Sequence, residues 1–314
     1  MNDYLAGLTT EAVNPDTLMI DECTTEEMIQ LMNQQDALVP AAIAQEIPQI
    51  AKAVDILHHR LSNGGRMFYI GAGTSGRLGV LDASECPPTF GTDPSLVQGY
   101  IAGGDIALRT AVEGCEDDMD GGIALIESIG VTDQDVLIGI SASGSANFVI
   151  AALAKAKEYG AATIGVCNNK DSKFEPIVDV CIAPVVGPEV ISGSTRLKAG
   201  TAQKLVLNML TTCTMVKLGK TYNNLMVDLK ASNIKLVDRS IRIIMNTTGV
   251  EASTAAETLE KASMNCKLAI MMIKTGLDAK EAEQALNANG GRLKQAISSW
   301  LKWAQDWNDG IDDL

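Results

Sequence analysis

Residues 67–85 read Met-Phe-Tyr-Ile-Gly-Ala-Gly-Thr-Ser-Gly-Arg-Leu-Gly-Val-Leu-Asp-Ala-Ser-Glu, and this stretch decides the predicted fold. Its first four residues, Met67–Ile70, predict a short buried strand. Three glycines then allow a sharp turn and a close approach to a ligand, and a helix begins near Leu78. Because the first N–H groups of a helix have no partner inside it, this strand–turn–helix unit predicts an anion site, usually for phosphate.

The glycines also match the G-x-G-x-x-G spacing of dinucleotide-binding folds, which is the less favoured alternative. That fold expects an acidic residue about 20 positions on, at the end of the next strand. Here the next predicted strand, Leu96–Ile101, ends in Ala-Gly-Gly, and the nearest acid, Asp105, has the position of a helix N-cap. The hydroxyls of Thr74 and Ser75 favour a phosphate monoester instead.

Strands and helices alternate from Arg66 to about Pro184. Strands are predicted at Met67–Ile70, Leu96–Ile101, Val136–Ile140, Ala162–Cys167 and Val178–Ile182, with helices near 75–84, 105–113, 118–128 and 145–159. Such alternation is typical of an α/β fold, an αβα sandwich whose parallel sheet is covered on both faces. In these sheets ligands bind beyond the carboxyl ends of the strands.

The flanking segments predict two domains. Before the sheet come an extended arm, a helix opened by a capping box at Thr24–Glu27, and a helix from Pro40 to Asn63 bent at Pro48. After it come helices at Lys198–Leu218 and Asn223–Thr247, and then four shorter helices. We therefore predict one domain over residues 1–247 and a small helical domain with an acidic tail over 248–314.

Composition excludes several classes of function. The chain has 314 residues and a formal charge of -14, which argues against nucleic acid and anionic membrane surfaces as partners. Two adjacent histidines, His58 and His59, argue against a histidine metal site and a Ser-His-Asp triad. Seven scattered cysteines, no signal-like start and no membrane-length apolar run predict a cytoplasmic protein with reduced thiols.

Three hydroxyl-rich loops supply candidate phosphate-binding residues. They follow predicted strands or precede a long helix, and their members are Gly73, Thr74 and Ser75; Ser141, Ser143 and Ser145; and Ser192 and Ser194. One such loop alone is more typical of a helix cap. Three at one sheet edge favour phosphate, because hydroxyls, backbone N–H groups and helix dipoles can satisfy its oxygens without a cationic cluster. Lys198 is a nearby cation that could instead pair with surrounding acids.

Two carboxylates are candidates for proton transfer. Glu85 precedes a double proline at the predicted end of the first helix, and Glu116 lies in a turn after the helix at 105–113. A single glutamate in a loop is usually a solvated charge or a cap, whereas a pair beside a phosphate site suits proton transfer at carbon or at a leaving oxygen. Glu189 is a third candidate, for substrate hydroxyls.

Longer motifs carry a resemblance. Residues 71–79 (GAGTSGRLG), 81–89 (LDASECPPT) and 187–204 (GPEVISGSTRLKAGTAQK) resemble the bacterial N-acetylmuramic acid 6-phosphate etherases, and the likeness covers almost the whole chain. The resemblance implies a sugar isomerase (SIS) fold, a ubiquitin-associated-like (UBA-like) helical domain and a cytoplasmic homodimer that needs no metal or cofactor. It also implies release of D-lactate from the phosphorylated amino sugar in peptidoglycan recycling, with Glu85 and Glu116 as the catalytic carboxylates.

One departure affects the second hydroxyl loop: the family commonly has Arg-Thr-Pro where this chain has Ser145-Ala146-Asn147. Two other hypotheses stay open on the residues. One is a sugar-phosphate sensor without turnover, like the related glucokinase regulatory protein, and the other is an aldose–ketose isomerase on the same fold. For the etherase we expect elimination across C2 and C3 followed by hydration, because an alkoxide leaves poorly unless it is protonated.

Overall fold

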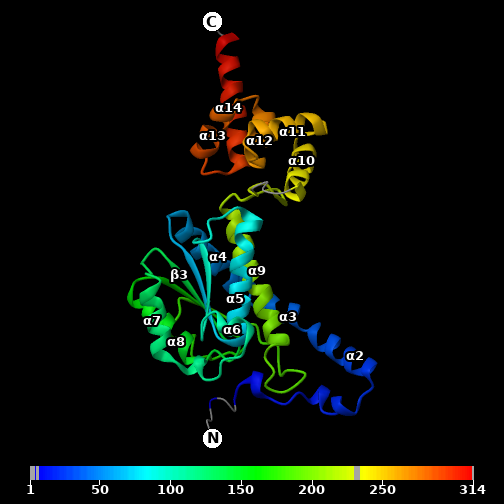
Figure 1. The fold of residues 1–314 in the computed structure, drawn as a ribbon, viewed down its shortest axis with the longest axis vertical. Coiled ribbons are helices and arrows are strands. Elements are labelled where there is room, and N and C mark those ends of the chain that lie inside the picture. The colour runs from blue at the N-terminus through cyan, green and yellow to red at the C-terminus, as the bar shows by residue number, and fades with distance from the viewer. Residues whose placement is uncertain (1–3, 5–6, 230–233, 313–314) are drawn as a thin grey trace. The chain divides into compact units, whose positions relative to one another are not determined.

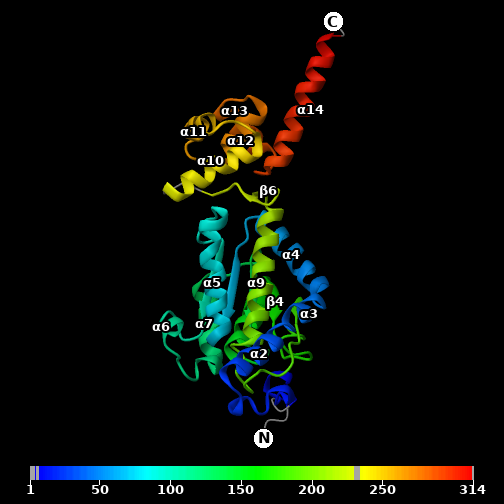
Figure 2. The same ribbon diagram turned by 90° about the vertical axis from the view of Figure 1, so that its right-hand side faces the viewer.

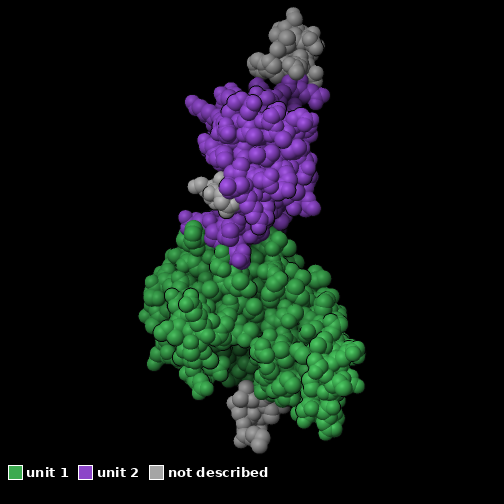
Figure 3. Space-filling view, turned by 45° about the vertical axis from the view of Figure 1, so that its right-hand side comes forward, with its two compact units in different colours: residues 1–84, 94–213 green, residues 85–93, 214–314 purple. Residues whose placement is uncertain are grey.

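The computed structural model describes residue 4, residues 7–229 and residues 234–312. It divides into two compact units, residues 1–84 with 94–213 and residues 85–93 with 214–314, drawn in green and purple in Figure 3. Each unit has its own core and is described by itself. Compactness alone does not define a domain, so the boundary after residue 247 stays a prediction.

A five-stranded parallel sheet lies at the centre of the first unit, as predicted. Its strand order is β2-β1-β3-β4-β5. The strands are β1 (Met67–Gly71), β2 (Val97–Ile101), β3 (Val136–Ile140), β4 (Ala162–Val166) and β5 (Val180–Ile182). The chain runs outward from β1 to β2 and in the opposite direction from β3 to β5, so the order switches between β1 and β3, where such sheets bind ligands.

Helices cover both faces of this sheet. They are α4 (Ile47–Ser62), α5 (Gly73–Phe90) and α9 (Lys198–Lys217) on one face, and α7 (Met119–Ser128) and α8 (Asn147–Glu158) on the other (Figure 1). On β1, Phe68 and Ile70 belong to the core cluster under α7 and α8. Tyr69 points the other way and donates from its hydroxyl to Asp82 of α5 at 2.9 Å. The strand is buried on both faces, which explains its unbroken apolar sequence.

Helix α5 is longer than predicted. It runs through Pro87 and Pro88 to Phe90 instead of ending near residue 84. Gly91 follows it with φ +62 and donates its N–H to the Pro87 carbonyl at 2.9 Å, so a left-handed glycine ends the helix. The two prolines are accommodated in its last turns.

The segments before the sheet differ partly from prediction. Helix α2 (Thr25–Asp36) has the predicted capping box between Thr24 and Glu27. The predicted bent helix is instead two helices, α3 (Val39–Ala44) and α4, because Pro48 lies in the first turn of α4, where a missing N–H costs nothing. The arm contains three 3₁₀ turns, η1 (Thr9–Glu11), η2 (Pro15–Thr17) and η3 (Ile20–Glu22).

The second unit is mostly helical, as predicted, but the helix predicted from Asn223 was wrong in its first part. A two-stranded hairpin, β6 (Thr221–Tyr222) and β7 (Leu225–Met226), occupies that position, because Asn223 adopts φ +51 in its turn. Residues 230–233 of the prediction lie outside the described residues. Helices α10 (Ile234–Thr248), α11 (Ala252–Lys261), α12 (Cys266–Thr275), α13 (Ala279–Ala288) and α14 (Leu293–Asp312) follow (Figure 2).

The core of this unit is built around α12, which packs against α10, α11, α13 and α14. Lys267 of α12 is buried; it pairs with Asp228 at 2.9 Å and donates to the carbonyls of Gly219 and Gly291. Gly91 packs so closely here that an added Cβ would lie 2.0 Å from the Asp228 carbonyl oxygen. That approach ties the segment after Glu85 to this unit.

Candidate active site

A pocket of about 470 Å³ lies at the switch point of the sheet, at the carboxyl ends of β1 and β3. Most of the predicted binding residues and one predicted carboxylate line it: Gly73, Thr74, Ser75, Ser141, Ser143, Ser145 and Glu116. Its described lining includes no lysine, arginine or histidine. An anion bound here would therefore be held by hydroxyls and backbone N–H groups.

Two helices begin at this pocket. Helix α5 starts at Gly73, two residues after β1 ends. Helix α8 starts at Asn147, after residues 141–145, which we call the serine loop. The N-cap residue of α8, Ala146, supplies no side-chain acceptor. The first N–H groups of such a helix and the positive end of its dipole can therefore serve a bound anion.

Glycine makes the first turn possible. A Cβ on Gly71 would lie 2.6 Å from the backbone nitrogen of Gly76, so no larger residue fits where strand and helix meet. Gly73 lies in the left-handed region, with φ +54. Beside them, Ser75 is buried and donates to Gln203 of α9 at 2.8 Å. This bond holds the turn against α9.

The serine loop places three hydroxyls in a row. The oxygens of Ser141 and Ser143 are 3.3 Å apart, and those of Ser143 and Ser145 are 2.8 Å apart. Gly144 has φ +67, and a Cβ there would collide with Ser172, which packs under the loop. Three hydroxyls that bond chiefly to one another can turn to donate to phosphate oxygens.

The third hydroxyl loop, residues 192–195, contributes Thr195 to the lining. Ser192 is exposed, and neither it nor Ser194 is among the described lining residues. Glu189 is fully buried, and its two oxygens accept the N–H groups of Lys198 and Ala199 at 2.9 Å each. It thus caps the start of α9. Contact of these residues with substrate stays a prediction.

Lys198 is buried with its amine bonded to Gln35 of α2 at 2.7 Å. Burial lowers the pKa of Lys198, and the nearby carboxylate of Glu189 opposes that shift. In the described contacts this lysine joins α9 to α2 beneath the third loop.

The two predicted catalytic carboxylates lie in different units. Glu116 belongs to a 3₁₀ turn, η4 (Cys115–Asp117), which follows the short helix α6 (Ile106–Arg109), and lines the pocket. Asn147 of α8 donates to Asp117 at 3.4 Å and holds the turn against the start of α8. Glu85 is exposed on α5, in the part assigned to the second unit, and is not among the described lining residues.

Sequence reasoning missed several residues at this site, among them Glu11, Asp117 and Asn169. Glu11 of η1 lines the pocket. Asn169, after β4, is buried and bonds both to Thr10 and to the carbonyl of Ala142 in the serine loop. The arm has no periodic pattern, so the only available signal was the Thr-Thr-Glu run at 9–11 in a polar segment.

Close relatives match this chain over nearly its whole length. The N-acetylmuramic acid 6-phosphate etherase of Clostridium acetobutylicum is 56% identical over 297 residues, which is 95% of this chain and 98% of that protein. Those of Caldanaerobacter subterraneus subsp. tengcongensis and Serratia proteamaculans are each 52% identical, over 93% and 94% of this chain and 96% and 99% of theirs. The chain belongs to the N-acetylmuramic acid 6-phosphate etherase family.

Three protein-family models, each matching one region of the chain, agree with its membership of the etherase family. Residues 49–157 match the N-terminal SIS domain of glucokinase regulatory protein, residues 124–213 a SIS domain, and residues 223–285 the C-terminal lid domain of glucokinase regulatory protein. The predicted SIS-type sandwich followed by a helical region is therefore confirmed.

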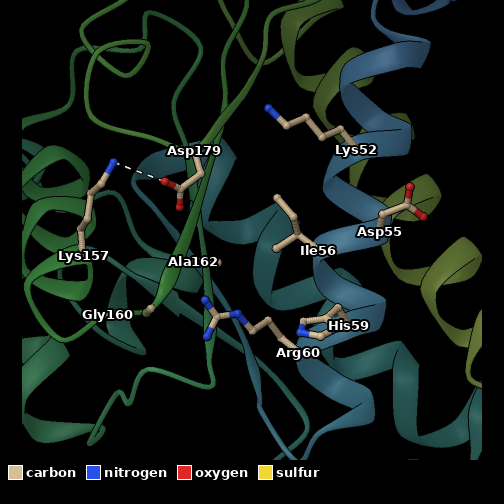
Figure 4. A pocket seen from close by; sticks show the side chains of 10 residues that line it. Lys52, Asp55, Ile56, His59, Arg60, Lys157, Gly160, Ala162 and Asp179 are labelled. Atoms are coloured by element: carbon tan, nitrogen blue, oxygen red, sulfur yellow. Dashed lines mark ion pairs between the residues drawn. The ribbon is translucent and has the colours of Figure 1, made fainter.

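A second hollow, of about 660 Å³, lies at the opposite ends of the strands (Figure 4). Its wall includes Ala162, where β4 begins, and an ion pair of 3.4 Å between Lys157 and Asp179. It contains none of the hydroxyl loops, so it is not the site expected of an etherase. Over the described ranges, no three His, Cys, Asp or Glu side chains are placed to hold a metal ion, and no helix is long and apolar enough to cross a membrane.

Proposed function

We propose that this chain cleaves the D-lactyl ether of N-acetylmuramic acid 6-phosphate, giving N-acetylglucosamine 6-phosphate and D-lactate. The observation that carries the proposal is a pocket with two hydroxyl loops at two helix starts and Glu116 in its wall, in a chain 56% identical to a named etherase. The phosphate would bind to these loops. The sugar carbons would then extend toward Glu116 in the pocket wall.

The proposed reaction starts from the open-chain sugar, whose C1 aldehyde makes the C2 proton acidic. Glu116 takes that proton, and protonated Glu85 donates one to the departing ether oxygen. The C3–O bond breaks, lactate leaves, and a double bond forms between C2 and C3. Water then adds at C3, with Glu85 taking a proton from the water and Glu116 returning one to C2. The balance is one water consumed for each lactate released.

We further propose a homodimer in the cytoplasm that acts in recycling of cell-wall amino sugars. All seven cysteines are free thiols, which suits a reducing compartment. In the first unit, large apolar side chains are exposed on the arm, α2 and the segments around α3, and this supports a contact with a second copy: Leu18, Met19, Ile29, Leu38 and Ile47. Analytical sedimentation of the purified chain tests for the dimer directly.

The test of the reaction is incubation with N-acetylmuramic acid 6-phosphate in oxygen-18 water, with mass spectrometry of both products. Unlabelled lactate and a sugar phosphate labelled at C3 are expected. N-acetylglucosamine 6-phosphate incubated alone corrects for exchange of the C1 oxygen. Label in lactate would contradict cleavage on the sugar side, and bound but intact substrate would favour a sensor. In deuterium oxide the product should also carry deuterium at C2.

A further inference from the structure

The carboxylate of Glu11 is a component of the pocket that neither the phosphate loops nor the proposed chemistry accounts for. It reaches the pocket from η1, far in sequence from every other lining residue. A Cβ added to Gly193, in the third hydroxyl loop, would lie 3.8 Å from its Oε2 atom. The carboxylate therefore lies between the arm and that loop at the pocket wall.

The backbone that carries Glu11 is held firmly, although its side chain is exposed. Thr10 is fully buried, and its hydroxyl accepts the amide N–H of Asn169 at 3.1 Å. Thr9 donates from its hydroxyl to the amide oxygen of Asn169 at 2.8 Å. The N–H of Glu11 bonds to the carbonyl of Leu8 at 3.1 Å, closing the 3₁₀ turn. A side chain on such a fixed turn can recognise a ligand without a large ordering cost.

An ionised carboxylate can only accept hydrogen bonds. The substrate of the proposed reaction has two anionic groups, its phosphate and its lactyl carboxylate, and neither can donate to Glu11. Its remaining polar groups include hydroxyls and the amide N–H of the acetamido group, which can. The other two acids of the lining have other roles: Glu116 is assigned to proton transfer, and Asp117 accepts from Asn147.

We propose that Glu11 is a substrate-specificity residue that accepts a hydrogen bond from a hydroxyl or the amide N–H of the amino sugar. The inference rests on the proposed function for the identity of the sugar. The negative charge also disfavours an anion beside it, so both the phosphate and the lactyl carboxylate should bind away from Glu11.

The first experiment compares Glu11→Ala with Glu22→Ala, a change to an exposed glutamate of the same arm outside the described lining. Loss of a hydrogen bond to a charged group predicts a KM raised about 10- to 100-fold with kcat nearly unchanged, because the contact is made before and during the reaction. The Glu22 variant should match the unaltered protein. An unchanged KM in Glu11→Ala would overturn the proposal.

The second experiment measures binding by calorimetry and needs no turnover, so its result stands apart from the fate of the proposed reaction. Glu11→Ala should weaken binding of N-acetylglucosamine 6-phosphate by a similar factor and leave binding of inorganic phosphate unchanged or stronger. Equal weakening for both ligands would mean that Glu11 only shapes the phosphate loops, which contradicts the proposal. Glucose 6-phosphate, which lacks the acetamido group, identifies the donor. The weakening caused by Glu11→Ala should persist with this ligand if the donor is a hydroxyl, and disappear if the donor is the amide N–H.

Discussion

The side-chain amide of Asn169 donates to the main-chain carbonyl of Ala142 at 3.0 Å, and so reaches the middle of the serine loop. The same nitrogen donates to Thr10 on the N-terminal arm at 3.1 Å. One buried side chain thus links a hydroxyl loop to the turn that presents Glu11. Two walls of the pocket depend on a single amide.

Replacing Asn169 by Asp should loosen both walls. The substitution keeps the size of the side chain and its accepting oxygen but removes the N–H groups that bond to Ala142 and Thr10. We expect a loss of about 1–3 kcal/mol in unfolding free energy and weaker sugar-phosphate binding. Urea unfolding and calorimetry measure the two effects. Asn33→Asp, at an exposed position of α2, is the control; if both variants behaved alike, the link would have no role.

The fold was largely predictable because its signals are local. The strand Met67–Ile70 is buried on both faces and therefore apolar throughout, and each parallel strand needs a helical return. The errors occur where one residue changes the backbone direction: Asn223 turns the chain into a hairpin, and Gly91, not the prolines, ends α5. Such choices depend on tertiary contacts.

The site was predictable where chain order alone places the residues. Thr74 and Ser141 follow neighbouring strands, so parallel pairing brings them together. Glu11 was missed because its position depends on bonds to Asn169, nearly 160 residues away in sequence. In the sequence Glu189 lies three residues before the third hydroxyl loop, which is why it was predicted to contact the substrate. Only the structure, in which it is buried and accepts the N–H of Lys198, shows that it caps α9.

Replacing Glu189 by Gln tests its capping role. A carboxylate that accepts two backbone N–H groups becomes an amide whose nitrogen faces one of those donors. The buried, unsatisfied N–H should cost about 1–3 kcal/mol of unfolding free energy. Thermal and urea unfolding measure the loss, with exposed Glu175→Gln as the control. A raised KM at unaltered stability would instead support the predicted contact with substrate.

Mixing variants tests whether two copies share a site. Glu85→Gln and Glu116→Gln should each abolish lactate release while sugar-phosphate binding persists, because each removes one proton-transfer group. Since Glu85 is not among the described lining residues, we expect a second copy to supply it. In a two-fold dimer, refolding equal amounts of both variants together should then restore about a quarter of full activity. No recovery despite proven exchange of subunits would place both carboxylates in one chain.

Asp135 should make stability depend on pH at the acid end. Burial raises the pKa of Asp135, but hydrogen bonds from Arg66 and from the backbone of Thr132 outweigh this and hold the pKa below its ordinary value. A lowered carboxyl pKa stabilises the fold above the unfolded value of about 3.9, and the contribution is lost as pH falls through the folded pKa.

Asp135→Asn should therefore cost about 2–4 kcal/mol of unfolding free energy at pH 7, because Arg66 loses its charged partner. The gap in unfolding free energy to the unaltered protein should shrink as pH falls below about 4, because the carboxyl of the unfolded chain takes up its proton first and the native carboxyl does so only at lower pH. Urea unfolding at pH 7 and pH 3 checks this, with exposed Asp133→Asn as the control. An equal gap at both pH values would mean that the pair contributes through packing and not through its charge.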